Sequence, residues 1–370
     1  MKYRDNELYH DLALDDSGTK IIDLNFNDPL SAISFLFYGT NGGTSNKANC
    51  MHDVVTKIEI VDGSDVLLSL SLKQLQALHA YQTGRFPYSL AYEDADGDSK
   101  DHATLFFGRW LWDTQYFMDL KKFSNPQLKI TTDEDVIRAM GAEGLLSGSL
   151  DVSIVAHVME DPALVSQGFF MNKEIYAFTS GTSGNEYVPL PRDYPYASVM
   201  LHSTIRGSDI HELISNLKLS CDSDKFIPFN RNGKDISETY ENFNPPFTMR
   251  GHFWRKNAET INFPLYYNPR IVLLPKSTNS IVGCPWIWSG NASLYLYDHA
   301  GAAITSEIGI NAQIFGTDPH CSIIHKFGVT NDPATYFDPT LWKEVQLVLT
   351  QAAAGAVKVS LQQMRPLAQG

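Results

Sequence analysis

Residues 93–101 form the most acidic stretch of the sequence and have the residue types that could bind a hard cation. Calcium takes about six to eight oxygen ligands, and closely spaced carboxylates could supply part of that set. The order differs from that of a calcium-binding loop, because Gly97 precedes the third acidic residue counted from Asp94, and Leu105 stands where a bidentate glutamate is needed. We therefore expect a solvated loop at the outer rim of the first folding unit, with calcium binding as the alternative.

Three histidines and a cysteine form a second candidate metal site. His320, Cys321 and His325 lie close together in the sequence, and His299 precedes them. Their number and spacing match no structural zinc class. We predict no metal and no cofactor.

Two W-x-W pairs, Trp110 with Trp112 and Trp286 with Trp288, place aromatic rings at alternate positions. On a strand, residues two apart share a face, so each pair would form a broad aromatic surface. Such a surface could stack against a sugar. We favour barrel core or a contact between subunits, because aromatic anchors dominate obligate interfaces.

No segment of the sequence has the pattern of a catalytic nucleophile. The Gly- and Ser-rich segment 180–184 lacks the G-x-S-x-G order of a serine nucleophile and the lysine of a phosphate-binding loop, so it predicts a flexible turn. Acidic residues are abundant, but none stands out as the acid or base of a glycoside hydrolase. We predict no catalytic residue and no enzyme.

Composition limits the partners and the environment of the chain. Its 370 residues favour two folding units, and its 29 basic against 42 acidic residues give a net charge of −13. We expect no direct nucleic-acid binding, because binding to phosphates needs clustered Lys and Arg. The sequence has neither an apolar run of bilayer length nor an N-terminal signal peptide, which predicts a soluble, non-exported protein. Without a C-x-x-C pair, we expect buried thiols at Cys50, Cys221, Cys284 and Cys321.

The positioning elements are predicted to be strands almost throughout. Period-two alternation recurs along the chain, and only 71–81 and 235–243 have the apolar spacing of a helix. Each helix follows a strand, a turn and a strand: 58–60 opens the first set and 217–219 the second. Both halves also end in a similar pair of strands. The repeated order predicts an all-β fold of two tandem jelly rolls with one short helix in each.

The boundaries follow from where the alternation lapses. We expect an N-terminal arm at 1–17, a first jelly roll at 18–161, a linker at 162–171 and a second jelly roll at 172–370. The second unit is longer, and its residues 276–340 are rich in Gly, Asn, Pro and Ser. This composition predicts long loops inserted between strands.

Short motifs in this arrangement resemble a known family. The strand-turn-strand-helix unit is followed by Leu105-Phe106-Phe107-Gly108-Arg109, then by residues 125–130, and the second unit opens near Tyr194-Pro195-Tyr196. Over roughly residues 18–366 the chain resembles the double jelly-roll major capsid proteins of tailless icosahedral viruses, which include membrane-containing bacteriophages and related double-stranded DNA viruses.

The resemblance implies a structural role in a virion capsid assembled in the host cytoplasm. It implies homotrimers of nearly hexagonal outline that tile an icosahedral shell beside penton or minor capsid proteins. It also implies that the N-terminal arm lies at the inner face, near an internal membrane or a neighbouring trimer. A frayed, solvated terminus is the alternative for this segment. The alternatives are a carbohydrate-active or glycan-binding protein on two jelly rolls, and a minor capsid or spike protein.

Overall fold

The computed structural model describes most of the chain, and strands dominate it. It describes residues 2–367 except 26, 43–50, 93–96, 137–144, 162, 205–207, 244–245, 256–258, 263–264, 276–281, 289–290, 298–299 and 306–307, and gives the backbone alone for 91–92, 241–243, 308–310 and the rest of 251–296. Within this part of the chain, no helix is long and apolar enough to cross a membrane.

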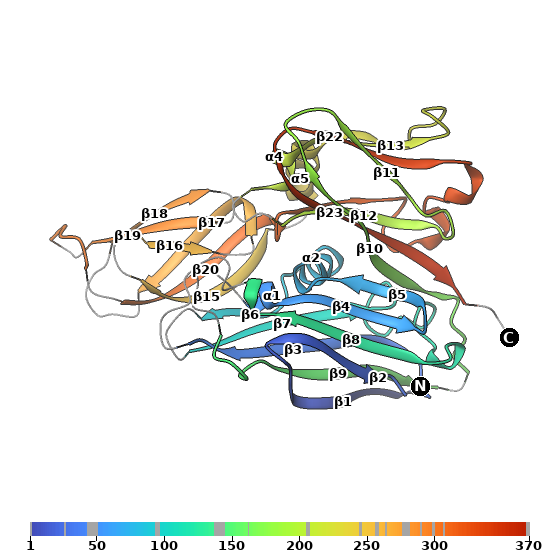
Figure 1. Cartoon of the computed structure of the whole chain (residues 1–370), viewed down its shortest axis with the longest axis horizontal. Helices are drawn as coiled ribbons and strands as arrows, with labels where there is room; N and C mark the ends of the chain where they lie inside the picture. Colours follow the sequence, from blue (N-terminus) through green and yellow to red (C-terminus); the bar gives the residue numbers. More distant parts are fainter. Residues whose placement is uncertain are drawn as a thin grey trace.

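The first half of the chain folds into two sheets with the strand orders β1-β9-β3-β7-β6 and β2-β8-β4-β5 (Figure 1). When β6 and β7 are taken as one strand, the first, last, third and sixth strands form one sheet, and the second, seventh, fourth and fifth form the other. The bounds are β1 (Lys2–Ala13), β2 (Ser17–Asp23), β3 (Leu30–Thr40), β4 (Val55–Asp62), β5 (Asp65–Leu70), β6 (Ser89–Tyr92), β7 (Asp98–Phe106), β8 (Pro126–Asp133) and β9 (Asp151–Glu160).

The second half repeats this order, with the sheets β10-β23-β12-β21 and β11-β22-β13-β14. The predicted fold of two tandem jelly rolls is therefore confirmed. The bounds are β10 (Gly168–Ser180), β11 (Asn185–Pro189), β12 (Tyr196–Ser203), β13 (Ile214–Cys221), β14 (Asn230–Asn232), β21 (Ser322–Lys326), β22 (Val345–Gln351) and β23 (Gly355–Pro366).

Both predicted helices are present and follow the fifth strand of their barrels. Helix α2 (Leu72–Thr83) begins at Ser71, whose side chain caps it, and ends at Gly84 in the left-handed conformation. Helix α5 (Gly233–Phe243) takes the same place in the second barrel. The short helices are α1 (Met51–Val54), α4 (Ile210–Leu213), η1 (Leu120–Lys122), η2 (Pro333–Thr335) and η3 (Pro339–Leu341).

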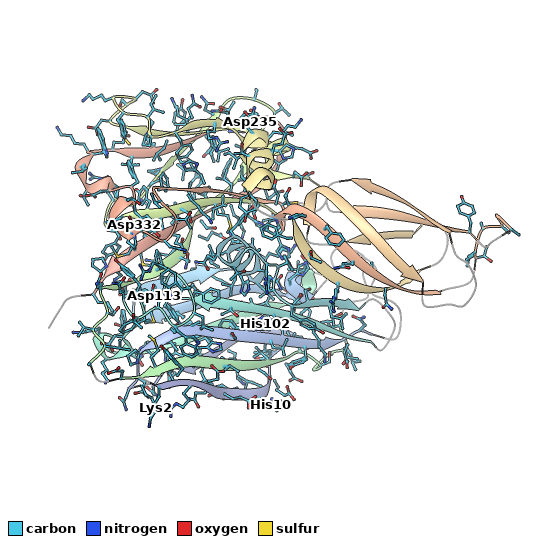
Figure 2. All side chains as sticks on the ribbon, turned by 180° about the vertical axis from the view of Figure 1, so that it is seen from behind. Lys2, His10, His102, Asp113, Asp235 and Asp332 are labelled. Carbon is cyan, nitrogen blue, oxygen red and sulfur yellow. The ribbon has the colours of Figure 1, made fainter. Side chains whose placement is uncertain are left out.

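The expected N-terminal arm is wrong, because this segment is the first strand of the first barrel. β1 pairs antiparallel with β9, from Lys2 opposite Glu160 to Ala13 opposite Asp151. Figure 2 shows Lys2 and His10 along the outer edge of the barrel. The strand is charged and mostly exposed, so its sequence lacks the apolar alternation that marks a strand with one buried face. Similarly, β10 begins at Gly168, inside the segment predicted as a linker.

The extra length of the second half lies between α5 and β21, earlier than the expected 276–340, and it contains strands. Two of its strands, β15 and β17, flank β20 and extend the first barrel's sheet beyond β6, while β16, β19 and β18 form a separate sheet. We call residues 247–319 the insertion. Its strands are β15 (Phe247–Arg255), β16 (Glu259–Asn262), β17 (Leu265–Pro275), β18 (Val282–Trp288), β19 (Asn291–Tyr297) and β20 (Ile308–Pro319).

The two barrels share a sheet and have separate apolar cores. β5 pairs in parallel with β10, where Leu68 lies opposite Asn172, so one sheet runs from the first barrel into the second. The first core also takes in Phe247 and Ile314 of the insertion, whereas the second core consists of second-barrel residues. The insertion therefore completes the packing of the barrel that precedes it in the sequence.

Candidate functional site

A buried polar cluster joins the first barrel to the second at α2, which lies between them (Figure 1). Gln76 on α2 is fully buried. Its Nε2 donates to Oδ1 of Asp101 at 3.3 Å and to the His102 carbonyl at 3.1 Å. Its Oε1 lies 2.7 Å from Nε2 of His320, in the turn between β20 and β21. One side chain thus links a first-barrel strand to the turn that leads into a second-barrel strand.

Asp101 also contacts polar groups on two further elements. Its Oδ2 lies 3.2 Å from Nδ1 of His52 on α1, and its Oδ1 accepts a hydrogen bond from the Ser89 hydroxyl on β6. All three side chains are buried. A buried carboxylate is tolerated only when hydrogen bonds replace its hydration, so Asp101 holds α1, β6 and β7 together in one arrangement.

Three buried histidines lie in this cluster, and two of them are kept neutral. The His52 and His320 rings are 4.6 Å apart. Burial, then the charges of Lys73 and Lys358, lowers the pKa of His202 to about 3, and burial is also the main cause that lowers the pKa of His320. The Nδ1 atoms of His202 and His320 have no hydrogen-bond partner among the described residues. Their protonated forms would therefore be strongly disfavoured in the folded chain.

Other polar contacts cross the same junction. Glu174 on β10 accepts a hydrogen bond across the junction from Gln74 on α2 and another within the second barrel from Lys358 on β23, each at 3.0 Å. The Tyr81 hydroxyl on α2 donates to the Ser322 carbonyl on β21 at 2.7 Å. Directional contacts of this kind hold the two barrels at a set distance and angle, which apolar packing alone specifies less strictly.

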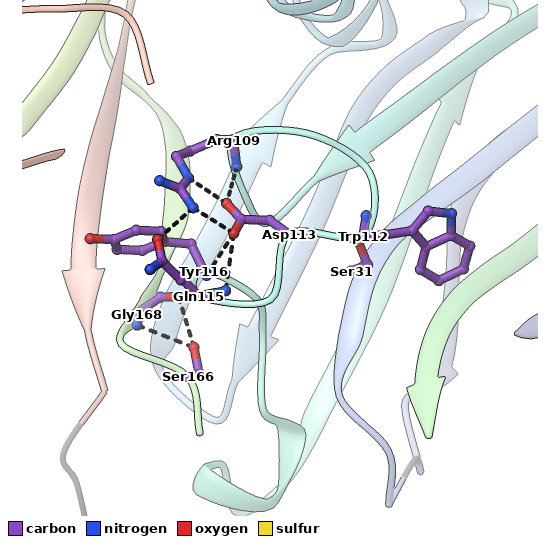
Figure 3. Close-up of polar contacts among 8 residues, drawn as sticks. All are labelled: Ser31, Arg109, Trp112, Asp113, Gln115, Tyr116, Ser166 and Gly168. Atoms are coloured by element: carbon purple, nitrogen blue, oxygen red, sulfur yellow. Dashed lines mark hydrogen bonds and ion pairs between the residues drawn. The ribbon is translucent and has the colours of Figure 1, made fainter. Parts of the chain in front are cut away.

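A second polar centre lies in the loop after β7 (Figure 3). The Arg109 guanidinium donates from Nε to Oδ2 of Asp113 at 2.6 Å and from Nη2 to Oδ1 at 2.8 Å. The backbone N–H groups of Arg109 and Gln115 also donate to this carboxylate. Burial raises the pKa of Asp113, but these donors outweigh it and the pKa is lowered. Arg109 also lies 4.3 Å from the Trp110 ring and 4.9 Å from the Tyr116 ring, so the loop is rigidly held.

This loop lies at the end of the molecule that carries both termini. Lys2 pairs with Glu160 at the end of β9, and Gly168 pairs with Pro366 at the end of β23, while the insertion projects from the opposite end (Figure 1). Several exposed apolar side chains lie at the terminal end, on the loops after β7, β9 and β21: Trp110 47%, Val165 63%, Val329 61% and Leu341 76% exposed. Such side chains are available for contacts with other molecules.

The first W-x-W pair does not form the expected surface on one strand face. Trp110 and Trp112 lie in the loop after β7, and Trp112 has a positive φ of 68°, which breaks the alternation. Trp112 packs 5.0 Å from the Tyr3 ring and 5.7 Å from the His157 ring, while Trp110 stays half exposed. Trp286 and Trp288 are on β18, but their side chains lie outside the described residues.

The acidic stretch is only partly the expected solvated loop. Residues 93–96 lie outside the described part of the chain. Asp98 begins β7 and accepts from the Thr40 hydroxyl at 2.8 Å, and Asp101 is the buried centre of the junction cluster. The expectation of a solvated loop is therefore wrong for Asp101, because β7 turns it toward the interior.

The histidines and cysteine that were considered as metal ligands do not lie together in the structure. His320 contacts Gln76 and His52, whereas the His325 ring stacks on Phe229 at 3.9 Å. Cys321 and Cys221 are buried thiols, as predicted, and His299, Cys50 and Cys284 lie outside the described residues. Across the described chain, no group of three or more His, Cys, Asp or Glu side chains could hold a metal ion.

The segment 180–184 forms the predicted turn, between β10 and β11. Ser180 is buried, and its hydroxyl donates to the carbonyls of Ala353 at 2.7 Å and Gly355 at 3.0 Å. These bonds tie the turn after β10 to the turn before β23. The serine thus has a structural role at the end of the second barrel.

The buried polar cluster around Gln76 could not be predicted from the sequence, because its members are far apart in the chain. Gln76 and His320, for example, are separated by 244 positions. The Arg109 and Asp113 pair does leave a local signal, since opposite charges four residues apart flank two tryptophans. That signal could have predicted a closed loop in place of a strand.

The strand order and the double barrel define a class of proteins by fold: two jelly rolls in one chain, joined side by side. No model of a known protein family matches this sequence, and no curated protein sequence matches it. Solved structures do match over their whole length.

Three of these structures are viral capsid proteins. The STIV major capsid protein, from Sulfolobus Turreted Icosahedral Virus, has a TM-score of 0.60 at 12% identity, covering 99% of this chain and 97% of that chain. The major capsid protein of Bacteriophage PM2 has a TM-score of 0.54 at 9% identity, covering 100% and 99%. The PBCV-1 virus capsid has a TM-score of 0.56 at 8% identity, covering 98% and 93%. These similarities show that the chain has the double jelly-roll fold of such proteins.

Proposed function

We propose that this chain is a viral major capsid protein, which self-assembles as trimers to tile an icosahedral shell. The observation that supports this most is that two major capsid proteins match 99% and 100% of this chain, with TM-scores of 0.60 and 0.54. The proposed role is structural, located in the virion capsid, with copies of the same chain and penton or minor capsid proteins as partners.

The rigid double barrel suits this role physically. A trimer of two-barrel chains presents six barrels, so its outline is nearly hexagonal and can pack into a lattice. Each contact between subunits would bury on the order of 2,000 Å² or more, as in obligate assemblies. The exposed apolar residues Trp110, Val165, Val329 and Leu341 are candidates for burial between neighbours.

The two ends of the molecule differ in a way that suggests an orientation. The family resemblance puts the N-terminal segment at the inner face of the shell, and both termini lie at one end. We therefore propose that this end faces the interior and that the insertion faces outward. Because residues 2–13 form β1, we do not propose that a free N-terminal arm contacts an internal membrane.

The experiment is light scattering of the purified protein after size exclusion, followed by electron microscopy. A capsid role predicts a mass three times the chain's 41.4 kDa, or larger particles, and a pseudo-hexagonal outline in projection. A stable monomer at micromolar concentration would contradict the proposal. Counting copies in purified particles separates a major capsid protein from a minor or spike component, since a shell needs far more copies.

A further inference from the structure

A cleft of about 560 Å³ lies between the helices of the two barrels. One side is the C-terminal end of α2, with Tyr81 and Gly84. The other side is formed by Arg231 on β14, Thr239 on α5 and Lys326 on β21. Figure 1 shows α2 between the barrels with α5 above it. The cleft is separate from the buried Gln76 cluster and is open to solvent.

The described residues that line this cleft include two basic side chains, Arg231 and Lys326, and no acidic one, in a chain whose net charge is −13. Lys326 Nζ donates to the Tyr81 carbonyl at 3.0 Å, and Arg231 Nη2 donates to the Thr239 hydroxyl at 3.0 Å and to the Asp235 carbonyl at 3.3 Å. All these acceptors are neutral. Neither cation forms an ion pair with any residue that the structure describes.

The surroundings of the two cations leave their charges largely uncompensated. Burial alone lowers the pKa of Lys326, with no carboxylate contributing. Burial, and then the Arg231 charge, lowers the pKa of His325 in the same lining to about 4. On the exposed side of α5, Glu238 pairs with Lys234 at 3.7 Å.

A buried carboxylate acts on two tyrosines of the cleft lining. Asp318 is buried and accepts a hydrogen bond from Ser237. Its charge contributes, after burial, to raising the pKa of Tyr81 and of Tyr240. Asp318 does not contribute to the lowered pKa of Lys326, which burial causes.

The remaining lining residues give the cleft an apolar part. Ile236, Ile324 and Tyr240 lie beside the threonine hydroxyls of Thr83, Thr239 and Thr330. A guanidinium and an ammonium are groups that bind phosphate oxygens, and Arg can do so with two parallel bonds. The volume exceeds what a bare inorganic anion fills, which leaves space for an apolar body next to the anionic group.

We propose that this cleft binds a soluble organic phosphate, whose phosphate group lies between Arg231 and Lys326 and whose apolar part contacts Ile236 and Tyr240. Because the lining comes from both barrels, the bound anion would bridge them and stabilise their relative position. The proposal depends on the cleft alone and is independent of shell assembly.

Titration calorimetry on the purified full chain, in its native oligomeric state, tests this with phenyl phosphate and inorganic phosphate as probes. We expect phenyl phosphate to bind at least about tenfold more tightly than inorganic phosphate, and Arg231→Gln or Lys326→Gln each to weaken it about tenfold, as loss of one charge-assisted bond predicts. Lys234→Gln, on the exposed side of α5, is the matched control and should bind normally.

Equal binding by Arg231→Gln and the control would overturn the proposal, as would absence of phenyl phosphate binding up to about 10 mM. If Lys326→Gln does not fold, Arg231→Gln decides alone, since its side chain makes only local contacts with α5. Melting curves without ligand establish that each variant is folded. Trimer formation by a protein that binds no phosphate would leave the capsid proposal standing and this one refuted.

Discussion

At the scale of single residues, the loop after β7 depends on one carboxylate. Asp113 is 1% exposed and takes bonds from the Arg109 side chain and from three backbone N–H groups, those of Arg109, Gln115 and Tyr116. The loop reaches the second barrel through ring contacts, because Tyr116 packs 6.1 Å from Phe170. A change at Asp113 should therefore affect more than its own loop.

We expect Asp113→Asn to reduce the free energy of unfolding by about 3 kcal/mol, because it leaves the mostly buried Arg109 guanidinium without its counter-charge. Denaturant unfolding followed by fluorescence measures this, since Trp110 and Trp112 lie between Arg109 and Asp113 in the sequence. Asp224→Asn is the matched control: Asp224 pairs with Lys218 at 2.8 Å but is half exposed, so its loss should cost less than about 1 kcal/mol. Equal losses for the two variants would show that the Asp113 network does not stabilise the fold.

At the scale of elements, the regular patterns were predictable and the atypical ones were not. Strand β8 alternates strictly between buried and half-buried positions, and the hairpin of β4 and β5 turns at Gly63 with a φ of 60°, so both follow from sequence. β1 was missed because it is a charged edge strand. The insertion was misplaced because a composition rich in Gly, Asn and Pro also occurs in paired strands such as β18 and β19.

The packing of β15 predicts how the insertion contributes to stability. Phe247 is 1% exposed, belongs to the first core and lies 5.7 Å from the Tyr81 ring on α2. We expect Phe247→Ala to reduce the free energy of unfolding by about 3 to 5 kcal/mol through the cavity it leaves. Val329→Ala, at a 61% exposed position, should change it little. A wild-type unfolding midpoint for Phe247→Ala would mean that the insertion folds as an independent lobe.

At the scale of the whole molecule, the relation between the barrels rests on contacts that no local pattern encodes. The repeated order of strands and helices identified two similar units, so the fold could be predicted. The cluster around Gln76 and the cleft beside α5 could not, because their members come from both barrels and from the insertion. Only the tertiary arrangement brings them together, and it places neutral histidines where the barrels meet.

Three buried histidines, among them His202 where the barrels meet, predict that the molecule loses stability in mild acid. The pKa is lowered to about 4 in His79, about 3 in His202 and about 4 in His325, in each case mainly by burial. Below pH 6.5 the unfolded chain binds protons that the folded chain excludes, so stability is full above pH 6.5 and falls as the pH drops toward the folded values. Each histidine contributes a loss of about 1.4 kcal/mol per pH unit in that window.

Denaturant midpoints at several pH values between 7 and 5 measure this loss, and the slope against pH is the readout. We expect His202→Gln to have a shallower slope than the wild type, whatever its stability at pH 7, because glutamine does not titrate. Val329→Ala, an exposed substitution that changes no titratable group, should leave the slope unchanged. If His202→Gln keeps the full wild-type slope, the acid sensitivity arises elsewhere, and the junction between the barrels does not sense pH through this residue.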